Sequence, residues 1–215
     1  MKSQFVQAMA LLVFIAFVLS CGPAPQSIAL WNGNTFDGWV RFIPGDSVDV
    51  DTVWSIHDGM LYCTGKPTGY IRTQASFSNY KLHIEWRWVR EGGNSGVLLH
   101  CQEPDQVWPN CIEAQLQSKD AGDLVLIGPG QITVAGKTYK NEKQFLIIPN
   151  QKDGVEKSLG EWNAYDLVCR DRTIVCSVNG VEINRGENAS VNSGWIALQS
   201  EGAPIEFRNI VLEKL

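Results

Sequence analysis

The sequence predicts an all-β protein, a two-sheet β-sandwich of jelly-roll type. Three observations support this prediction. Short segments that alternate apolar and polar residues recur along the whole chain, as expected for half-buried strands. Turn residues such as Asp-Gly and Asn-Gly punctuate these segments about every 8–12 residues, the spacing typical of a sandwich. Segments with the 3.6-residue period of an amphipathic helix are nearly absent.

The first twenty residues predict a secretory signal peptide. Lys2 precedes the apolar run "AMALLVFIAFVL", which is shorter than a typical membrane span. The ending "VLSC" resembles a bacterial lipoprotein cleavage site, so we expect residues 1–20 to be removed and Cys21 to be lipidated. An ordinary signal peptide followed by a free cysteine is the alternative. Residues 21–27 would then form the lipidated cysteine and a short tether, and residues 28–215 a single domain anchored in the bacterial cell envelope, periplasmic or at the outer-membrane surface.

The mature chain is acidic. Without Lys2 it has 17 Lys and Arg against 23 Asp and Glu, a net charge of −6. The sequence has no basic stripe, so nucleic acid is not an expected partner. We expect contact with the membrane through the lipid anchor only.

The first strands follow from turn signals and alternation. Residues 53–63 predict a hairpin that turns at Asp58-Gly59. Residues 80–89 predict a strand with apolar residues on one face, and residues 95–102 predict another. The two faces of the 80–89 strand would carry Leu82, Ile84, Trp86 and Trp88 on one side, and Lys81, His83, Glu85 and Arg87 on the other.

The second half of the chain continues the pattern. The stretch "NQKDGVEKSLGEWN", residues 150–163, is the one place where we expect either a short helix or a loop. The remaining alternating or apolar segments predict strands over residues 123–128, 131–136, 143–149, 165–183 (with turns at 171–172 and 179–180), 194–200 and 205–215.

The stretch "NCIEAQLQSK", residues 110–119, predicts a strand with two different faces. Ile112, Ala114 and Leu116 would point to the core. The other face would carry Glu113 beside the amides of Gln115 and Gln117, with no cation among them. A carboxylate and amides offer both donors and acceptors, which suits hydroxyl-rich ligands. The sequence leaves open whether this face lies in a cleft or on an open back.

Five cysteines remain after Cys21, and their spacing contains no CxxC pair and no zinc pattern. An oxidising compartment would permit one or two disulfides, and Cys101–Cys111 is the first choice. Because five is odd, at least one thiol should stay free and buried. The five are Cys63, Cys101, Cys111, Cys169 and Cys176.

The acid–base candidates are carboxylates. The sequence has no G-x-S-x-G, phosphate-loop or HExxH motif, and only three histidines, which excludes a histidine-rich metal site. Glu85 and Glu113 lie on the polar faces of otherwise apolar strands. Two carboxylates across a cleft are typical of sugar chemistry. Glu85 has a second interpretation, a solvated sheet face beside His83 and Arg87. We expect no cofactor, and metal assistance stays open.

Aromatic and glycine-rich segments add binding candidates. Among eight tryptophans, Trp108 lies in the loop "DQVWPNC" that leads into the Glu113 strand, where an indole could stack on a sugar ring. Trp86 and Trp88 are better explained as core residues. The segment "EGGNSGVLL" places Asn94 in a tight entry to a strand, either beside a cleft or in a plain hairpin turn.

In order along the chain, these segments resemble the bacterial 3-keto-disaccharide hydrolase family, which has the concanavalin A-type jelly roll. Each matching piece is short, but together they cover nearly the whole mature chain in the expected order. The pieces are "LWNGNTFDGW" (30–39), "WSIHDGML" (54–61), "GGNSGVLL" (92–99), "IEAQL" (112–116), "GEWN" (160–163), "VNG" (178–180), "GWIALQSEG" (194–202) and "IEFRNI" (205–210).

The resemblance implies an enzyme that acts on oligosaccharides or glycosides oxidised to a ketone at carbon 3. The ketone acidifies the proton on carbon 2, so a base can remove it, and the glycosidic oxygen then leaves carbon 1. Addition of water completes a net hydrolysis. Such a reaction needs a base near carbon 2, an acid near the leaving oxygen and donors for the enolate oxygen.

Carried over to this chain, the resemblance implies that Glu113 is the base and that Gln115 holds a sugar hydroxyl. Arg87 and His100 would steady the enolate or protonate the leaving group. Glu85, Asn94 and Gln199 would line the rest of the cleft. Two alternatives remain: a non-catalytic carbohydrate-binding module on the same fold, and a structural domain whose polar Glu113 face lies on the open back.

Overall fold

The structure is a computed structural model that describes residues 26–45 and 48–215. The predicted signal peptide, Cys21 and most of the tether lie outside the described residues, so these stay predictions. Within the described part, the helical content is one short 3₁₀ turn, Val50–Thr52. No helix in this part of the chain is long and apolar enough to cross a membrane.

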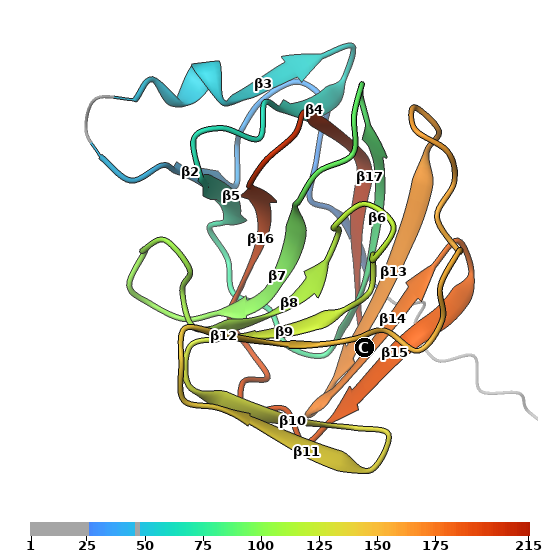
Figure 1. The fold of residues 1–215 in the computed structure, drawn as a ribbon. Coiled ribbons are helices and arrows are strands. Elements are labelled where there is room, and N and C mark those ends of the chain that lie inside the picture. The colour runs from blue at the N-terminus through green and yellow to red at the C-terminus, as the bar shows by residue number, and fades with distance from the viewer. Residues whose placement is uncertain (1–25, 46–47) are drawn as a thin grey trace, which may run out of the picture.

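The described chain forms two antiparallel sheets that pack face to face, which confirms the predicted sandwich. In Figure 1 the larger sheet runs through β6, β13, β14 and β15 on the right. We call it the large sheet. In spatial order it contains β11 (Lys137–Asn141), β10 (Gly130–Val134), β15 (Val181–Glu187), β14 (Thr173–Val178), β13 (Asn163–Arg170), β6 (Tyr80–Trp88), β17 (Ile205–Lys214), β4 (Met60–Cys63) and β3 (Trp54–His57), with β1 (Ser27–Ala29) paired to β17.

The second sheet, which we call the small sheet, has seven strands and carries the segment around Glu113 near its middle. Its strands pair in the spatial order β12 (Phe145–Ile148), β9 (Leu124–Ile127), β8 (Cys111–Gln115), β7 (Gly96–Cys101), β16 (Trp195–Ser200), β5 (Gly69–Thr73) and β2 (Trp39–Phe42).

The core lies between the two sheets and is filled by the faces that alternation marked as apolar. On β6 the inward residues are all buried, including Trp86 and Trp88, and on β8 the inward Ile112 and Ala114 are fully buried. Because successive strand residues point to opposite faces, the intervening residues of both strands must lie on the outer faces of the sandwich. Each sheet therefore has an outer face that is not part of the core and can carry a binding site.

The hairpin turns adopt the backbone that their sequences predict. Asp58 and Gly59 both have positive φ, 50° and 80°, as do Asn179 and Gly180 with the same values. Two central residues with positive φ are the requirement of the tight turn that matches strand twist. The Val53–Cys63 hairpin is thus confirmed, with β3 and β4 paired from Trp54↔Cys63 to His57↔Met60.

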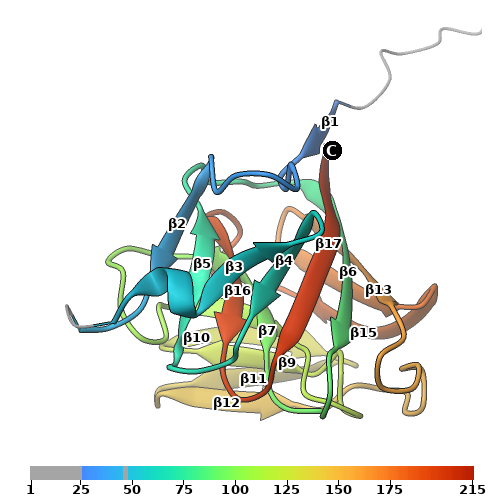
Figure 2. The same cartoon turned by 90° about the horizontal axis from the view of Figure 1, so that it is seen from above.

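The two ends of the domain meet. β1 pairs with β17, and Lys214 N donates to Gln26 O (Figure 2). The strand begins at Ser27, one residue before the predicted domain boundary. Residues 150–162, in the stretch for which a helix or a loop was expected, form an irregular segment. The side chain of Asn163, the first residue of β13, accepts a hydrogen bond from Lys157 N in this segment at 2.8 Å.

All five cysteines of the described chain are free thiols and all are buried. The predicted Cys101–Cys111 disulfide is therefore wrong, although the two residues lie on the neighbouring strands β7 and β8. Burial, and then the Cys101 thiol beside it, raises the pKa of Cys111. A buried neutral thiol packs as a small apolar side chain, and these cysteines fill that role.

Candidate functional site

The outer face of the small sheet carries a pocket of about 160 Å³. Pockets for drug-sized ligands measure roughly 300–1,000 Å³, so a pocket of this size suits a single ring. The face of β8 opposite the core thus lies in a pocket rather than on an open back. The lining residues are Asn94, Trp108, Glu113, Gln115, Gln117, Val125, Ile127, Phe145, Ile147, Gln199 and Glu201.

Strand register explains why residues from distant parts of the chain meet here. Across four neighbouring strand pairs, Ile147 pairs with Val125, Val125 with Glu113, Glu113 with Leu98, and Leu98 with Ala197. Paired residues of adjacent strands point to the same face. Glu113 therefore has aliphatic neighbours in its row on both sides.

Glu113 is only 4% exposed, and its Oε1 atom has no hydrogen-bond partner in the described chain. Its carboxylate lies across Gly96, where an added Cβ would sit 2.1 Å from Oε1. Burial raises the pKa of Glu113 from 4.5 to about 8, and the negative charges of Glu201 and Asp123 add to the rise. A carboxylate with no stabilising partner and little water becomes a stronger base.

Glu201 is the second titratable group of the pocket, and sequence reasoning did not place it there. Asn94 Nδ2 donates to Glu201 Oε2 at 2.7 Å. Burial raises the pKa of Glu201, and the hydrogen bond from Asn94 partly offsets the rise. A usable signal was present, because Glu201 follows Gln199 by two residues and shares its side of the chain.

The polar half of the pocket is rich in unsatisfied acceptors. Gln115 Nε2 donates to Gln117 Oε1 at 3.0 Å. Asn94 Oδ1, Glu113 Oε1 and Gln199 Oε1 are buried and have no partner among the described residues. A buried acceptor without a donor costs about 1–3 kcal/mol, so a ligand that brings hydroxyl donors would recover that free energy. The predicted positions of Asn94, Gln115 and Gln199 in one cleft agree with this geometry.

The other half of the pocket is apolar. Trp108, which adopts a positive φ of 66° in the loop before β8, lies in the pocket as predicted. Val125 and Ile127 of β9 and Phe145 and Ile147 of β12 complete this half. Sequence reasoning missed the β12 residues because all four positions of that strand are apolar, so alternation cannot show which pair faces out.

Glu85 and Arg87 do not belong to the pocket, and the prediction that they line the same cleft as Glu113 is wrong. Both lie on the outer face of the large sheet. There Arg208 Nε donates to Glu85 Oε2 at 2.6 Å, and Arg87 Nε donates to Glu206 Oε2 at 2.6 Å. Alternation identified their face correctly but could not say which sheet the strand joins.

Trp162 lies against both of these arginines on the large sheet. The guanidinium carbon of Arg208 is 4.0 Å from the Trp162 ring centroid, and that of Arg87 is 4.6 Å away. Each arginine is thus held by a carboxylate and an indole together. Such fully engaged cations stabilise a sheet surface and have no contact with the Glu113 pocket.

His100 also lies away from the pocket, and its predicted place beside the leaving group is wrong. The β7–β16 pairing shifts register between Trp195 and Ala197, and His100 adopts a positive φ of 57° there. Such a bulge reverses the alternation, so Cys101 reaches the outer face while His100 packs edge-on against Tyr80 of the large sheet, 5.6 Å between centroids. Burial lowers the pKa of His100 to about 4.

The described residues contain no group of three or more His, Cys, Asp or Glu side chains that could hold a metal ion. The pocket itself supplies two carboxylates and four amides. None of its lining residues is a cation.

The sequence profile of the 3-keto-alpha-glucoside-1,2-lyase-like domain matches residues 26–213. The chain belongs to this family. The match confirms the resemblance expected from the short motifs, and together with the fold it supports a function on carbohydrates. No curated protein matches the chain.

Solved structures show the same fold at low sequence identity. Two putative glycosyl hydrolases from Parabacteroides distasonis superpose with TM-scores of 0.65 and 0.64, at 20% and 22% identity. The alignments cover 88% of this chain in each case, and 94% and 100% of theirs. A β-glucanase from Bacillus licheniformis has a TM-score of 0.57 at 13% identity, with 89% of this chain and 98% of that one covered. These likenesses confirm the jelly-roll sandwich.

Proposed function

We propose that this protein cleaves the glycosidic bond of 3-keto-glycosides, with Glu113 as the base. The observation that supports the proposal best is a buried, unpartnered carboxylate whose pKa rises to about 8, inside a pocket of amides on the fold of glycosyl hydrolases. The family of the chain names the same class of substrate.

The reaction has three steps, which are proton removal, elimination and addition of water. Glu113 takes the proton from carbon 2, and the electron pair of the C–H bond moves into the ketone, forming an enolate. The enolate then expels the glycosidic oxygen from carbon 1, which leaves a carbon 1–carbon 2 double bond, and the leaving oxygen takes the proton that Glu113 carries. Glu113, again a carboxylate, removes a proton from water as its hydroxyl adds to carbon 1, and returns that proton to carbon 2. The net result is hydrolysis, and the bond breaks without an oxocarbenium ion.

The environment of Glu113 suits removal of a weakly acidic C–H proton. A base with a raised pKa accepts such a proton more readily than an ordinary carboxylate, once the base is ionised. The amide N–H groups of Gln115 and Gln199 donate to the enolate oxygen and the sugar hydroxyls. Glu201 accepts a hydrogen bond from a sugar hydroxyl. Its charge adds to the effect of burial on the pKa of Glu113.

The decisive experiment is release of nitrophenol from the two anomers of 4-nitrophenyl 3-keto-glucoside. The wild-type protein should release it at a rate that rises with pH through about 8, because Glu113 ionises there. Glu113→Gln should lower the rate by about 10²–10⁴-fold, the usual contribution of a general base. The matched control is Glu85→Gln, a carboxylate on the other sheet, which should keep the wild-type rate.

The unoxidised 4-nitrophenyl glucosides separate this route from ordinary glycoside hydrolysis, since they lack the ketone that acidifies carbon 2. They should not be cleaved. Equal cleavage of the oxidised and unoxidised sugars would contradict the elimination route. No release from any of them, with glycan binding intact, would replace the enzyme with a carbohydrate-binding module on the same fold.

A further inference from the structure

The pocket has a second feature, an apolar strip that leads away from the carboxylates. We define the strip as Trp108, Val125, Ile127, Phe145 and Ile147. None of these side chains except the Trp108 indole N–H can form a hydrogen bond. The pocket is therefore divided into a polar part that can hold a sugar and an apolar part that cannot match sugar hydroxyls.

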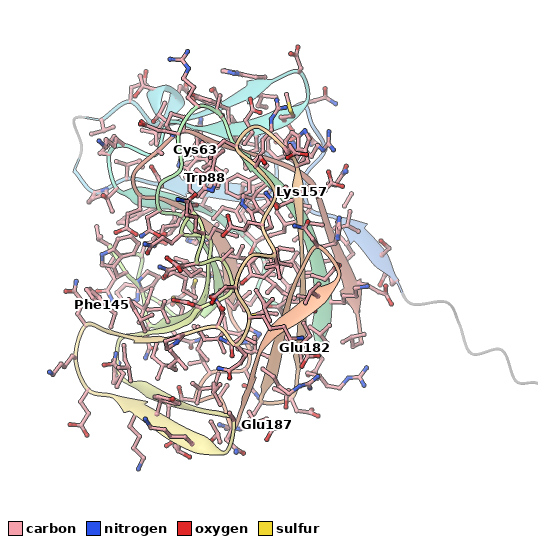
Figure 3. The ribbon with its side chains drawn as sticks, turned by 45° about the vertical axis from the view of Figure 1, so that its right-hand side comes forward. Cys63, Trp88, Phe145, Lys157, Glu182 and Glu187 are labelled. Carbon is pink, nitrogen blue, oxygen red and sulfur yellow. The ribbon has the colours of Figure 1, made fainter. Side chains whose placement is uncertain are left out.

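The outer end of the strip is unusually exposed. Phe145 is 54% exposed and Ile147 is 49% exposed, whereas the alternate residues of β12, Leu146 and Ile148, pack against the core. Figure 3 shows Phe145 at the margin of the molecule, on the opposite side of the view from Lys157. Exposed apolar residues on an edge strand invite aggregation, so their presence indicates a ligand that covers them.

Strand geometry fixes where such a ligand would lie. Ile147, Val125 and Glu113 form one register row across β12, β9 and β8. Neighbouring strands are about 4.8 Å apart, so Ile147 lies roughly 10 Å from Glu113 along this row. A group attached at carbon 1 of a sugar held by Glu113 could extend over the strip at that distance.

The chemistry of the strip selects among leaving groups. A second sugar ring would place several hydroxyls against side chains that offer no partner, and each unpaired buried hydroxyl weakens binding. An anionic leaving group would be repelled by the negative charges of Glu113 and Glu201, because the pocket has no cation to offset them. An alkyl or aryl leaving group would instead bury its own apolar surface together with that of the strip.

We propose that the apolar strip binds the leaving group, so that the preferred substrates are 3-keto-glycosides of apolar alcohols or phenols rather than 3-keto-disaccharides. This inference rests on the proposed function, because it names the aglycone of the same reaction. Phe145 and Ile147 determine specificity, and they do not touch the reacting atoms.

The test is a chain-length series of 3-keto-glucosides, from methyl to n-octyl, in both anomers. Alkanols are similar leaving groups, so the series reports binding to the strip. KM should fall by up to about fourfold for each methylene that leaves water, with kcat nearly constant. The n-octyl compound should have a higher kcat/KM than a 3-keto-disaccharide. A disaccharide preference, with KM independent of chain length, would overturn the inference and leave the proposed function standing.

Two variants test the location of the effect. Phe145→Ser should flatten the dependence of KM on chain length, and its exposed position makes the substitution compatible with folding. The matched control Leu159→Ser changes another exposed residue, 55% accessible and outside the pocket, and should keep the wild-type dependence. Equal behaviour of the two variants would overturn the inference.

A binding measurement tests the strip without the chemistry. Calorimetry with unoxidised methyl and n-octyl glucosides should show tighter binding of the longer chain, which Phe145→Ser weakens. If no 3-keto-glucoside is cleaved, the proposed function fails and the leaving-group assignment fails with it, whatever the calorimetry shows. Sedimentation of wild type and Phe145→Ser completes the test, because a dimer that the variant dissociates would identify a second copy as the occupant and overturn the inference.

Discussion

Glu113 and Glu85 occupy similar places in the sequence but opposite places in the molecule. Each is a carboxylate on the polar face of an alternating strand, with buried apolar residues on either side. The register partners of Glu113 are Val125 and Leu98, which are aliphatic. The register partner of Glu85 across β17 is Arg208, which donates to it.

The two pKa values diverge for this reason. Burial alone would raise the pKa of Glu85, but the hydrogen bonds from Arg208 and Asn209 outweigh the effect of burial. The pKa of Glu85 therefore lies below its ordinary value of 4.5. For Glu113, burial and the charge of Glu201 act in the same direction and raise the pKa to about 8. The neighbouring strands, not the strand that carries the residue, decide whether a carboxylate stabilises a surface or can act as a base.

The largest effect expected from this contrast, apart from the loss of turnover in Glu113→Gln, is on stability. Because the folded pKa of Glu113 is about 8 and the ordinary value 4.5, the folded state holds a proton between these values that the unfolded state loses. The free energy of unfolding should therefore fall as pH rises from about 4.5 to 8, by up to roughly 1.4 kcal/mol per unit. The total is about 4 kcal/mol, because ionisation is only partial near each of the two pKa values.

Urea unfolding of wild type and Glu113→Gln across this range measures the effect. The difference in unfolding free energy should favour the variant increasingly toward pH 8, since glutamine has no proton to lose. A constant difference between the two proteins from pH 4.5 to 8 would show that Glu113 does not titrate as its burial indicates.

A smaller effect is expected from the floor of the pocket. Gly96→Ala would place a Cβ 2.1 Å from Glu113 Oε1, so the carboxylate must move. A displacement of about 1 Å from the reacting position lowers turnover by up to roughly 10²-fold. The measurement is kcat on the aryl 3-keto-glucoside. The matched control is Gly92→Ala, whose Cβ would meet Ser118 Oγ at 2.3 Å and which should keep the wild-type kcat.

The charge of Glu201 should set part of the pH dependence. Glu201→Gln removes a negative charge near Glu113, so ionisation of Glu113 becomes easier and its pKa falls. The acidic limb of the kcat/KM profile should move to lower pH but remain above 4.5, because burial is the larger cause of the shift. An unmoved profile would mean that the two carboxylates do not interact.

The smallest effect is expected at Glu85. Its folded pKa lies below the ordinary value, so it stabilises the fold above that value and loses this contribution as pH falls. Glu85→Gln should destabilise the protein at pH 7 by roughly 0.2–1 kcal/mol, the usual range for a partly exposed ion pair. Thermal unfolding at pH 7 and in acid measures this, and a larger loss in acid than at pH 7 would contradict the assignment.

Much of the fold could be predicted because strand signals are local. Alternation over residues 80–89 and 111–115, together with Asp58-Gly59 and Asn179-Gly180, specified strands, turns and inward faces that the structure confirms. The strand predicted over residues 110–119 is shorter, because it ends at Gln115. The polar side of the Glu113 strand, with Gln115, was predicted for the same reason. His100 shows where this logic stops, because a one-residue bulge reverses the alternation without any mark in the sequence.

By itself, the sequence determined the all-β class, the turns and the polar face on which Glu113 lies, because each depends on residues close together in the chain. Only the tertiary structure decided that Glu85 and Arg87 lie on the other sheet, that Glu201 joins Glu113, and that Phe145 extends the pocket. The physical reason is that strand pairing is a long-range choice. It brings together side chains more than a hundred residues apart, and with it come the burial and the charges that set the chemistry of a carboxylate.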